Sequence, residues 1–505
     1  MRVLLILFFC ITYCFSVFGQ VEQPKRYEIT LNGYEDGYNV LLAEEHGVII
    51  YKEKVDYNRN GDMLWEYIML DRDLKEVWKK EYYIENGLLY RGYDYYDENF
   101  YFLYQITRKS SKDLKLIKMN THSGDTVHYR VKNLVPLELA EFEVTASAAI
   151  IGGYYSTEPV VIHYDFLKKK TIVLPGIFGN KTELVQLKIN DDDSYHIIVS
   201  DKTYDKRNTL SVKTYDPSGN YIDNLTYEPE AEKGLIFGHA VDFNQNQNLL
   251  VSGTYGAKRS DYSRGIFIAN SRGAEKPQIQ YYNFADFDNF FSYMRAKRQK
   301  RVANKISRKK IKGKKIKFNY RIIVHDILKD GDNYIMLGEA FYPKYSNTSS
   351  FGVDVYYHAN SRDYMPINFA GYQYTHAVVI GFDSEGNMLW DNSFEIEDVI
   401  SYSLEQFVNA EVTDEGVVLL YLYDNEIRSK IIKGSEVVEG KLFNDIALTF
   451  EDDAVRENNS SEISGLEQWY DNSFIAYGTQ KIKNLRDKGV RLNRRVFYLN
   501  KVVYK

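Results

Sequence analysis

The sequence predicts an all-β chain folded as an eight-bladed β-propeller, with seven blades as the alternative count and with one basic, helical insertion. The composition is the first observation: 45 Tyr and 27 Phe stand beside only 9 Pro in 505 residues. Aromatic residues are enriched in strands, where they cover pleated, half-buried surfaces. The second observation is a repeat of about fifty residues, and the third is a turn that recurs within it.

The repeat is a polar turn followed by a short apolar strand, and it occurs eight times. These strands begin at Gly47, Asn99, Ala148, Ser194, Asn248, Asn333, Gly416 and Ser473. Once two insertions, 287–317 and 342–371, are removed, the spacing is 46 to 57 residues throughout. Each repeat has room for four antiparallel strands, which is typical of propeller blades. A linear β-solenoid would use shorter repeats, and a β-sandwich would stop at about seven to nine strands.

The recurring turn lies between the third and fourth strands of a repeat. Its clearest examples are Asp216–Gly219 (DPSG) and Asp383–Gly386 (DSEG). An Asp side chain accepts hydrogen bonds from the backbone of its own turn, and Gly tolerates positive φ. These segments are therefore predicted to be hairpin corners.

These patterns predict a signal peptide at 1–19 and a single propeller domain at 20–505. The expected blades are 38–84, 88–134, 138–178, 182–230, 235–284, 320–398, 403–449 and 465–505. We expect segment 27–36 to be a strand that pairs with the C-terminal end of the chain. The last repeat is expected to supply a third strand and a short fourth strand there. Such pairing would close the ring and protect its edges.

The N-terminus has the features of a secretory signal. Arg2 precedes an apolar run from Val3 to Phe18, and Val17 and Gly19 have the spacing of a cleavage site. An uncleaved anchor is the alternative, but the run of about 16 residues is shorter than the roughly 20 that span a bilayer. Lipidation at Cys14 is disfavoured because no small residues precede it. We expect export in a bacterium to the periplasm, with the cell surface or the exterior as alternatives, since no sorting domain follows the last blade.

Both cysteines, Cys10 and Cys14, lie inside the signal, so the mature protein is expected to have none. This excludes a disulfide framework, a zinc–thiolate site and a cysteine nucleophile. The sequence also contains no phosphate-binding glycine loop and no local hydrolase or metalloprotease motif. We therefore predict no cofactor and no metal.

Two repeats resemble the D-x-x-G-x-x-x-W corner of quinoprotein-type propellers. Asp383–Trp390 (DSEGNMLW) matches the corner, and Asp71–Trp78 (DRDLKEVW) has the spacing without the Gly. Propellers of this type are often eight-bladed, and they include both cofactor-dependent dehydrogenases and non-catalytic scaffolds. The vicinal cysteines that are common in the dehydrogenases cannot occur in the mature chain. The resemblance thus implies the fold and favours a non-catalytic role.

The first insertion is strongly basic. In Arg295–Lys317, thirteen of 23 residues are Lys or Arg and none is acidic. The whole chain carries −6, so it would carry −19 without these thirteen charges. Phe290, Met294, Val302 and Ile306 are spaced by multiples of four, which predicts an amphipathic helix interrupted near Gly313.

This insertion is a candidate binding surface for an anionic partner. Its candidate residues are Arg295, Lys297, Arg298, Lys300, Arg301, Lys305, Arg308, Lys309 and Lys310. The expected partners are a protein, an acidic glycan or a lipid head group. Nucleic acid is not expected for an exported protein. In the alternative interpretation, a solvated arm folds back on its own acidic body.

The second insertion is polar and rich in tyrosine. Its candidate residues are Tyr342, Tyr345, Tyr356, Tyr357 and Tyr364. Tyrosine combines a flat apolar face with a hydroxyl group, which suits sugars and peptide backbones. The alternative is a structural loop that caps the mouth of the channel.

Two histidines, His239 and His325, fall on expected first strands, which line the channel of a propeller. Asp242 and Asp326 lie near them in the sequence. An acid–base or metal site requires such groups to converge, whereas a lone histidine on a strand is more often packed and hydrogen-bonded. The chain is therefore expected to be a non-catalytic binding or scaffolding module of the cell envelope. The alternative is an enzyme acting on a glycan or another polymer at the channel mouth.

Overall fold

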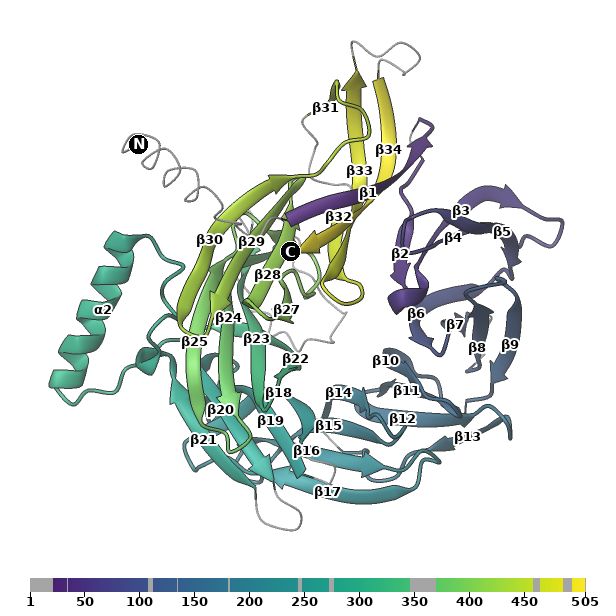
Figure 1. Cartoon of the computed structure of the whole chain (residues 1–505). Helices are drawn as coiled ribbons and strands as arrows, with labels where there is room; N and C mark the ends of the chain where they lie inside the picture. Colours follow the sequence, from purple (N-terminus) through teal and green to yellow (C-terminus); the bar gives the residue numbers. More distant parts are fainter. Residues whose placement is uncertain are drawn as a thin grey trace, which may run out of the picture.

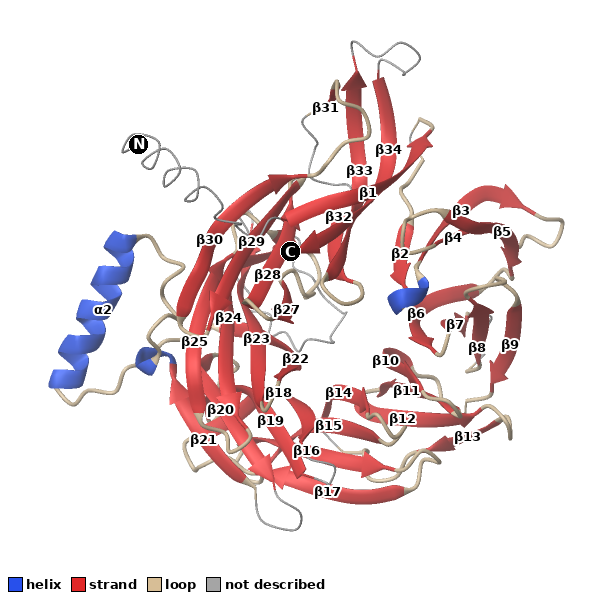
Figure 2. Ribbon diagram, viewed as in Figure 1, coloured by secondary structure: helices blue, strands red, loops and turns tan. Residues whose placement is uncertain are grey.

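The computed structural model describes residues 21–504 except 34, 108–111, 134, 180–181, 244–247, 272–276, 346–368, 457–463 and 485–492. Its strands form eight separate antiparallel sheets arranged around a ring (Figures 1 and 2). The prediction of an eight-bladed β-propeller with one helical insertion is confirmed. The alternative count of seven blades is wrong. No helix in the described part of the chain is long and apolar enough to cross a membrane.

The first four blades follow one another along the chain. Blade 1 has β2 (Asn39–Leu42), β3 (Val48–Tyr57), β4 (Met63–Leu70) and β5 (Glu76–Ile84), with the short helix η1 (Glu44–His46) between β2 and β3. Blade 2 has β6 (Leu88–Tyr96), β7 (Asn99–Ile106), β8 (Leu114–Asn120) and β9 (Thr126–Val131). Blade 3 has β10 (Glu138–Val144), β11 (Ala148–Tyr155), β12 (Glu158–Asp165) and β13 (Lys170–Val173). Blade 4 has β14 (Glu183–Ile189), β15 (Tyr195–Lys202), β16 (Asn208–Tyr215) and β17 (Tyr221–Tyr227).

The next three blades include the two insertions. Blade 5 has β18 (Lys233–Phe243), β19 (Asn248–Ala257), β20 (Ser263–Ser271) and β21 (Gln278–Asn283), and it is followed by η2 (Phe284–Asp286) and α2 (Ala296–Ile311). Blade 6 has β22 (Arg321–Asp330), β23 (Asn333–Tyr345), β24 (Phe369–Asp383), β25 (Met388–Glu395) and β26 (Ile400–Ser401). Blade 7 has β27 (Asn409–Thr413), β28 (Gly416–Tyr423), β29 (Glu426–Lys433) and β30 (Glu436–Asp445).

Blade 8 combines the two ends of the chain. It contains β31 (Asp453–Val455), β32 (Ser464–Gln468), β33 (Ser473–Asn484), β34 (Asn493–Tyr504) and the N-terminal β1 (Val21–Leu31). β1 pairs antiparallel with β34, with Glu28 opposite Tyr498. The closing strand thus ends at Leu31. The prediction that it extends to residue 36 is wrong. The C-terminal segment is one strand rather than two, because β1 supplies the outer strand.

The core is divided among the blade interfaces. Eight apolar clusters are buried, one between each pair of neighbouring blades. The cluster that joins blade 8 to blade 1 includes Trp469, Ile475 and Ile50. The indole Nε1 of Trp469 also donates a hydrogen bond to the carbonyl oxygen of Gly47 at 3.0 Å. The ring is therefore closed by packing on both sides of blade 8.

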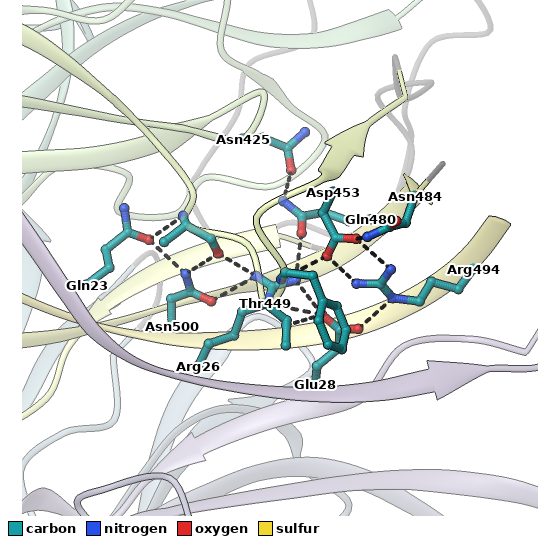
Figure 3. A network of polar contacts seen from close by, with 12 residues as sticks. Gln23, Arg26, Glu28, Asn425, Thr449, Asp453, Gln480, Asn484, Arg494 and Asn500 are labelled. Atoms are coloured by element: carbon teal, nitrogen blue, oxygen red, sulfur yellow. Dashed lines mark hydrogen bonds and ion pairs between the residues drawn. The ribbon is translucent and has the colours of Figure 1, made fainter. Parts of the chain in front are cut away.

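A polar network fastens β1 within blade 8 (Figure 3). The Arg494 guanidinium donates hydrogen bonds to two carboxylates, at 2.9 Å to Glu28 Oε1 and at 2.8 Å to Asp453 Oδ1. Arg26 donates to Glu28 Oε2 at 3.1 Å and to Asn500 Oδ1 at 2.9 Å. The ends of the chain are thus held by charges as well as by the strand ladder.

The basic insertion has two physically different halves. Residues 284–294 are packed into the core between blades 5 and 6, where Phe284, Phe290 and Met294 are buried. The helix starts only at Ala296. The prediction that Phe290 and Met294 lie on it is therefore wrong. Val302 and Ile306 do face inward, onto the same cluster. In Figure 1, α2 lies at the outer edge of the ring.

The second insertion is shorter in the structure than the segment 342–371 expected from the sequence. β23 continues through Tyr345, and β24 resumes at Phe369. Tyr342 and Tyr345 therefore lie at the end of a blade strand. Tyr356, Tyr357 and Tyr364 lie outside the described residues.

Candidate functional site

A pocket lies where the basic insertion meets blade 6, and we call it the arginine–tyrosine pocket. It has a volume of about 450 Å³ and is lined by Tyr262, Tyr293, Arg298, Asn319, Tyr320, Arg321, Phe341, Tyr342, Pro343 and Thr375. Small-molecule sites usually have volumes of about 300–1,000 Å³. None of these described lining residues is acidic, and two are arginines.

The pocket brings together segments that are far apart in the sequence. Tyr293 and Arg298 come from the basic insertion, and Arg298 lies in the first turn of α2. Arg321 begins β22, and Tyr342 lies near the end of β23, where the second insertion starts. Parts of both insertions thus contribute to one cavity beside blade 6.

The aromatic wall of the pocket is fixed by its neighbours. The Tyr293 ring stacks on the buried His376 ring, with centroids 3.7 Å apart and an interplanar angle of 6°. The hydroxyl oxygens of Tyr293 and Tyr320 lie 3.4 Å apart. A tyrosine hydroxyl is protonated at neutral pH at its ordinary pKa of about 10, and burial raises the pKa of both tyrosines further. They can therefore donate hydrogen bonds as well as accept them.

Positive charge enters the pocket from two sides. The guanidinium of Arg321 lies over the Tyr262 ring, 4.9 Å from its centroid, and this cation–π contact orients it. Arg298 is exposed on α2. Burial lowers the pKa of His376 to about 3, so this histidine is neutral and adds no charge. The two arginines therefore set the sign of the ligand that this cavity favours.

The predicted basic residues lie along α2, except for Arg295, which immediately precedes the helix. Lys310 pairs with Asp286 at 2.8 Å, and Lys305 lies 5.9 Å from the Phe318 ring centroid. Within the described ranges, Lys310 is the only cation of α2 with an ion pair. Of the nine residues singled out from the sequence, Arg298 alone lines the pocket. The others form a cationic surface beside it, which is exposed except at the half-buried Lys309.

The tyrosines of the second insertion divide into two groups. Tyr342 lines the pocket and is 48% exposed. Tyr345 lies three residues further along β23, with its ring 6.0 Å from that of Phe369. Sequence reasoning missed Tyr262, Tyr293, Tyr320 and Arg321. Tyr293 lies within the basic insertion, and Tyr320 and Arg321 directly follow it, which was their only signal; Tyr262 had none.

A second polar site lies on the inner strands of the ring. His239 on β18 has its Nδ1 2.7 Å from Oδ1 of Asp326 on β22. Gln186 on β14 donates to the same oxygen at 2.7 Å. The hydrogen bond from His239 lowers the pKa of Asp326, although the surrounding inner strands partly desolvate its carboxylate. The Asp326 side chain is 68% exposed, so it remains accessible to solvent.

His325 has a different environment from its neighbour Asp326. The pairing of β22 with β23 contains a bulge between Val324 and Ile327, and bulges redirect side chains. His325 is buried, with its Nε2 3.0 Å from Oε2 of Glu339. Glu339 in turn accepts a hydrogen bond from the Val408 amide at 2.6 Å and so ties blade 6 to blade 7. His325 is a structural residue and does not line a channel as the sequence suggested.

Carboxyl groups that the sequence did not single out occupy the inner strands of blades 2 and 3. Burial raises the pKa of Glu141 on β10 to about 7, and Asp326 contributes to the shift. The pKa of Glu143, two residues further along, is raised by burial and by Asp94 on β6. Among the residues that the structure describes, no three His, Cys, Asp or Glu are placed to hold a metal ion.

No family model and no curated protein matches the sequence. Similar folds include the polysaccharide lyase Uly1 (8% identity, TM-score 0.41, 82% of this chain and 89% of that chain). They also include the propeller domain of the Trilobed protease from Pyrococcus furiosus (9%, 0.37, 82% and 93%) and the Dos1 propeller (9%, 0.38, 96% and 95%).

Likenesses at these TM-scores carry no argument about function. The resemblance of Asp383–Trp390 to quinoprotein-type repeats has no family match and stays a prediction. The chain itself has the fold of an eight-bladed β-propeller.

Proposed function

We propose that this protein is an exported, non-catalytic binding module of the bacterial cell envelope that holds an acidic glycan on α2. The observation that carries the proposal is the exposed cationic surface of α2, which has one ion pair to the described parts of its own chain. Export rests on the signal features of residues 1–19, and we favour the periplasm as its destination.

The anchoring of α2 supports a binding role. A solvated arm would need no buried anchor, yet residues 284–294 are packed between two blades. The amides of Asp288 and Asn289 donate to the Asp391 carboxylate at 2.9 and 2.8 Å. This anchor holds a basic helix at the edge of a body that is otherwise acidic. Such a local positive field attracts anionic partners, although the rest of the chain carries a net negative charge.

The shape of the charged surface favours a linear polyanion over a membrane. A 16-residue helix is about 24 Å long, so it can follow several charges along a polymer. A helix that lies in a bilayer interface needs an exposed apolar face. Val302 and Ile306 are instead used for packing against the core. An acidic glycan therefore suits α2 better than a lipid head group.

Neutralising part of α2 is expected to weaken glycan binding at least about tenfold. The variant replaces Lys300, Arg301 and Arg308 by Gln, because each cation near an anionic surface contributes about 1 kcal/mol. Binding of polygalacturonate is measured by calorimetry at two salt concentrations. The matched control replaces Lys168–Lys170, three exposed lysines of blade 3, by Gln.

The salt series and a second probe decide the outcome. Wild-type affinity should fall as salt rises, because exposed charges are screened. Equal affinity of the α2 variant and the blade 3 control would refute the role of α2. Binding to vesicles of anionic lipid but not to polygalacturonate would reassign the surface to lipid head groups.

A second candidate function is catalysis on a glycan or another polymer at the inner strands. The observation that favours it is the contrast between Glu141, with its pKa raised to about 7, and Asp326, with its pKa lowered. Carboxyl groups whose environments separate their pKa values in this way suit general acid and general base roles.

This candidate predicts that Glu141→Gln and Asp326→Asn each reduce polymer cleavage by at least about a hundredfold, since acid–base groups contribute about 10²–10⁴ in rate. The assay follows new chain ends released from acidic polysaccharides. Glu138→Gln is the control, because Glu138 is an exposed residue of the same strand. Absence of cleavage by the wild-type protein would eliminate the catalytic candidate and leave the binding proposal.

A further inference from the structure

We propose that the arginine–tyrosine pocket binds one carboxylate-bearing sugar unit, with Arg298 and Arg321 selecting the carboxylate and the tyrosines contacting the sugar ring. This inference rests on the proposed function, because it identifies the glycan that α2 attracts as one built from acidic sugars. It also assigns to the pocket a task that differs from that of the helix surface. The helix supplies diffuse attraction, and the pocket supplies recognition.

The charge of the pocket selects an anion. Arg298 and Arg321 are the two ionised side chains in the described lining, and no carboxylate there neutralises them. A guanidinium offers a planar set of donors that matches a carboxylate in a bidentate manner. Arg321 is already oriented by its contact with Tyr262, so less side-chain freedom is lost when a ligand binds.

The aromatic lining supplies a surface for a ring. Tyr262 and Tyr342 are 42% and 48% exposed, although large aromatic side chains gain by burial. Tyr293 is held on the neutral ring of His376, and its hydroxyl is close to that of Tyr320. Flat faces with adjacent hydroxyl groups are complementary to a sugar, which has an apolar C–H face and polar edges. Tyr293 and Tyr320 are therefore held by their neighbours before any ligand arrives.

The other polar residues of the pocket favour a sugar over a lipid. Asn319 and Thr375 add an amide and a hydroxyl group to the tyrosine hydroxyls, which suits a ligand with several hydroxyls of its own. The volume of about 450 Å³ is within the range of small-molecule sites. A lipid head group would also bring acyl chains to this edge of the ring. The helix offers them no apolar face there, because Val302 and Ile306 face inward.

The inference is tested with digalacturonate, the uncharged disaccharide galactobiose, and inorganic phosphate. Calorimetry on the protein produced from Gln20 should detect digalacturonate, with galactobiose and phosphate each bound at least tenfold more weakly. Arg321→Gln and Tyr342→Ala should each weaken digalacturonate binding at least fivefold. Arg264→Gln is the matched control, because Arg264 lies on neighbouring β20 outside the pocket. Unchanged thermal unfolding shows that each variant is folded.

The α2 variant separates this inference from the proposed function. Gln at 300, 301 and 308 should reduce binding of polygalacturonate but change digalacturonate affinity less than threefold, since none of these residues lines the pocket. If the polymer binds and digalacturonate does not, the pocket inference is wrong and the proposed function stands. Equal binding of galactobiose, equal binding of phosphate, or full affinity in Arg321→Gln would each overturn the inference.

Discussion

Replacing Phe290 by alanine is expected to lower the free energy of unfolding by about 3–5 kcal/mol, the usual cost of truncating a buried Phe. Phe290 is fully buried in the cluster between blades 5 and 6. Its ring lies 4.4 Å from that of Phe284, 5.0 Å from Tyr320 and 5.2 Å from His376. Few neighbours there can move to fill the cavity, because they also pack against the two adjacent blades.

The matched control is Ile311→Ala in the same insertion. Ile311 is 86% exposed, so its truncation should change stability by less than about 0.5 kcal/mol. Both variants are compared with the wild-type protein by chemical denaturation. A loss below about 1 kcal/mol for Phe290→Ala would show that residues 284–294 are not part of the core, and the anchor of α2 would then have to be abandoned.

The same insertion shows where sequence periodicity fails. The spacing of Phe290, Met294, Val302 and Ile306 predicted one amphipathic helix, and the structure divides it at Arg295. The backbone of Asp288 and Asn289 bonds the Asp391 carboxylate on β25 instead of a helical neighbour. Tertiary partners on another blade override the local pattern, and no sequence window contains both partners.

The blade count could be predicted because each blade is specified locally. A polar turn followed by an apolar strand recurs about every fifty residues, and an Asp–Gly corner marks some of the repeats, so the count needs no long-range information. Corner geometry follows the same logic: the Asp383 carboxylate accepts the amides of Glu385 and Asn387 at 2.9 and 2.8 Å. Closure was harder, since the boundary of β1 is set by its partner β34 rather than by its own residues.

The inner strands explain why the central polar residues were only partly predicted. In blades 2 to 6, each first strand carries a bulge against the second strand. An extra residue reverses the alternation of faces beyond it. Glu141 and Gln186 directly follow such bulges, and His325 and Asp326 lie within one. Alternation read from the sequence therefore assigns these side chains to the wrong face or to none.

The arginine–tyrosine pocket could not be predicted for a related reason. The sequence singled out Arg298 and Tyr342 separately, each within an insertion. Arg298 and Tyr342 line the same pocket because β22 and β23 pack beside the anchor of α2. That packing cannot be inferred from local sequence patterns. Tyr293 and Arg321 looked like ordinary residues until their neighbours were known.

Asp453→Asn is expected to destabilise the closed ring by about 3–5 kcal/mol, the cost of breaking a buried ion pair from one side. Asp453 is fully buried and Arg494 nearly so. The substitution leaves the Arg494 guanidinium with Glu28 as its remaining carboxylate (Figure 3). β1 and β31 would then be held to blade 8 mainly by their strand ladders. The exposed Glu451→Gln, two residues away, is the control and should unfold like the wild-type protein.

The pH dependence of the same variant tests the charge rather than the shape of the network. Burial raises the pKa of Asp453, but hydrogen bonds from Arg494 and Asn484 outweigh burial and leave it below the usual value. The pKa of Glu28 is likewise lowered, because Arg494 and Thr449 outweigh burial. Carboxyl groups with lowered folded-state pKa values stabilise the fold above the unfolded values of about 3.9–4.3 and lose this effect as pH falls.

Wild-type stability should therefore decrease steeply as the pH falls below about 4, and that of Asp453→Asn should decrease less over the same range. Thermal unfolding followed between pH 3 and pH 7 measures both slopes. Parallel curves would mean that the Asp453 carboxylate is not ionised in the folded ring. In that case a neutral hydrogen bond, which Asn can replace, would be what holds β31 against the two ends of the chain.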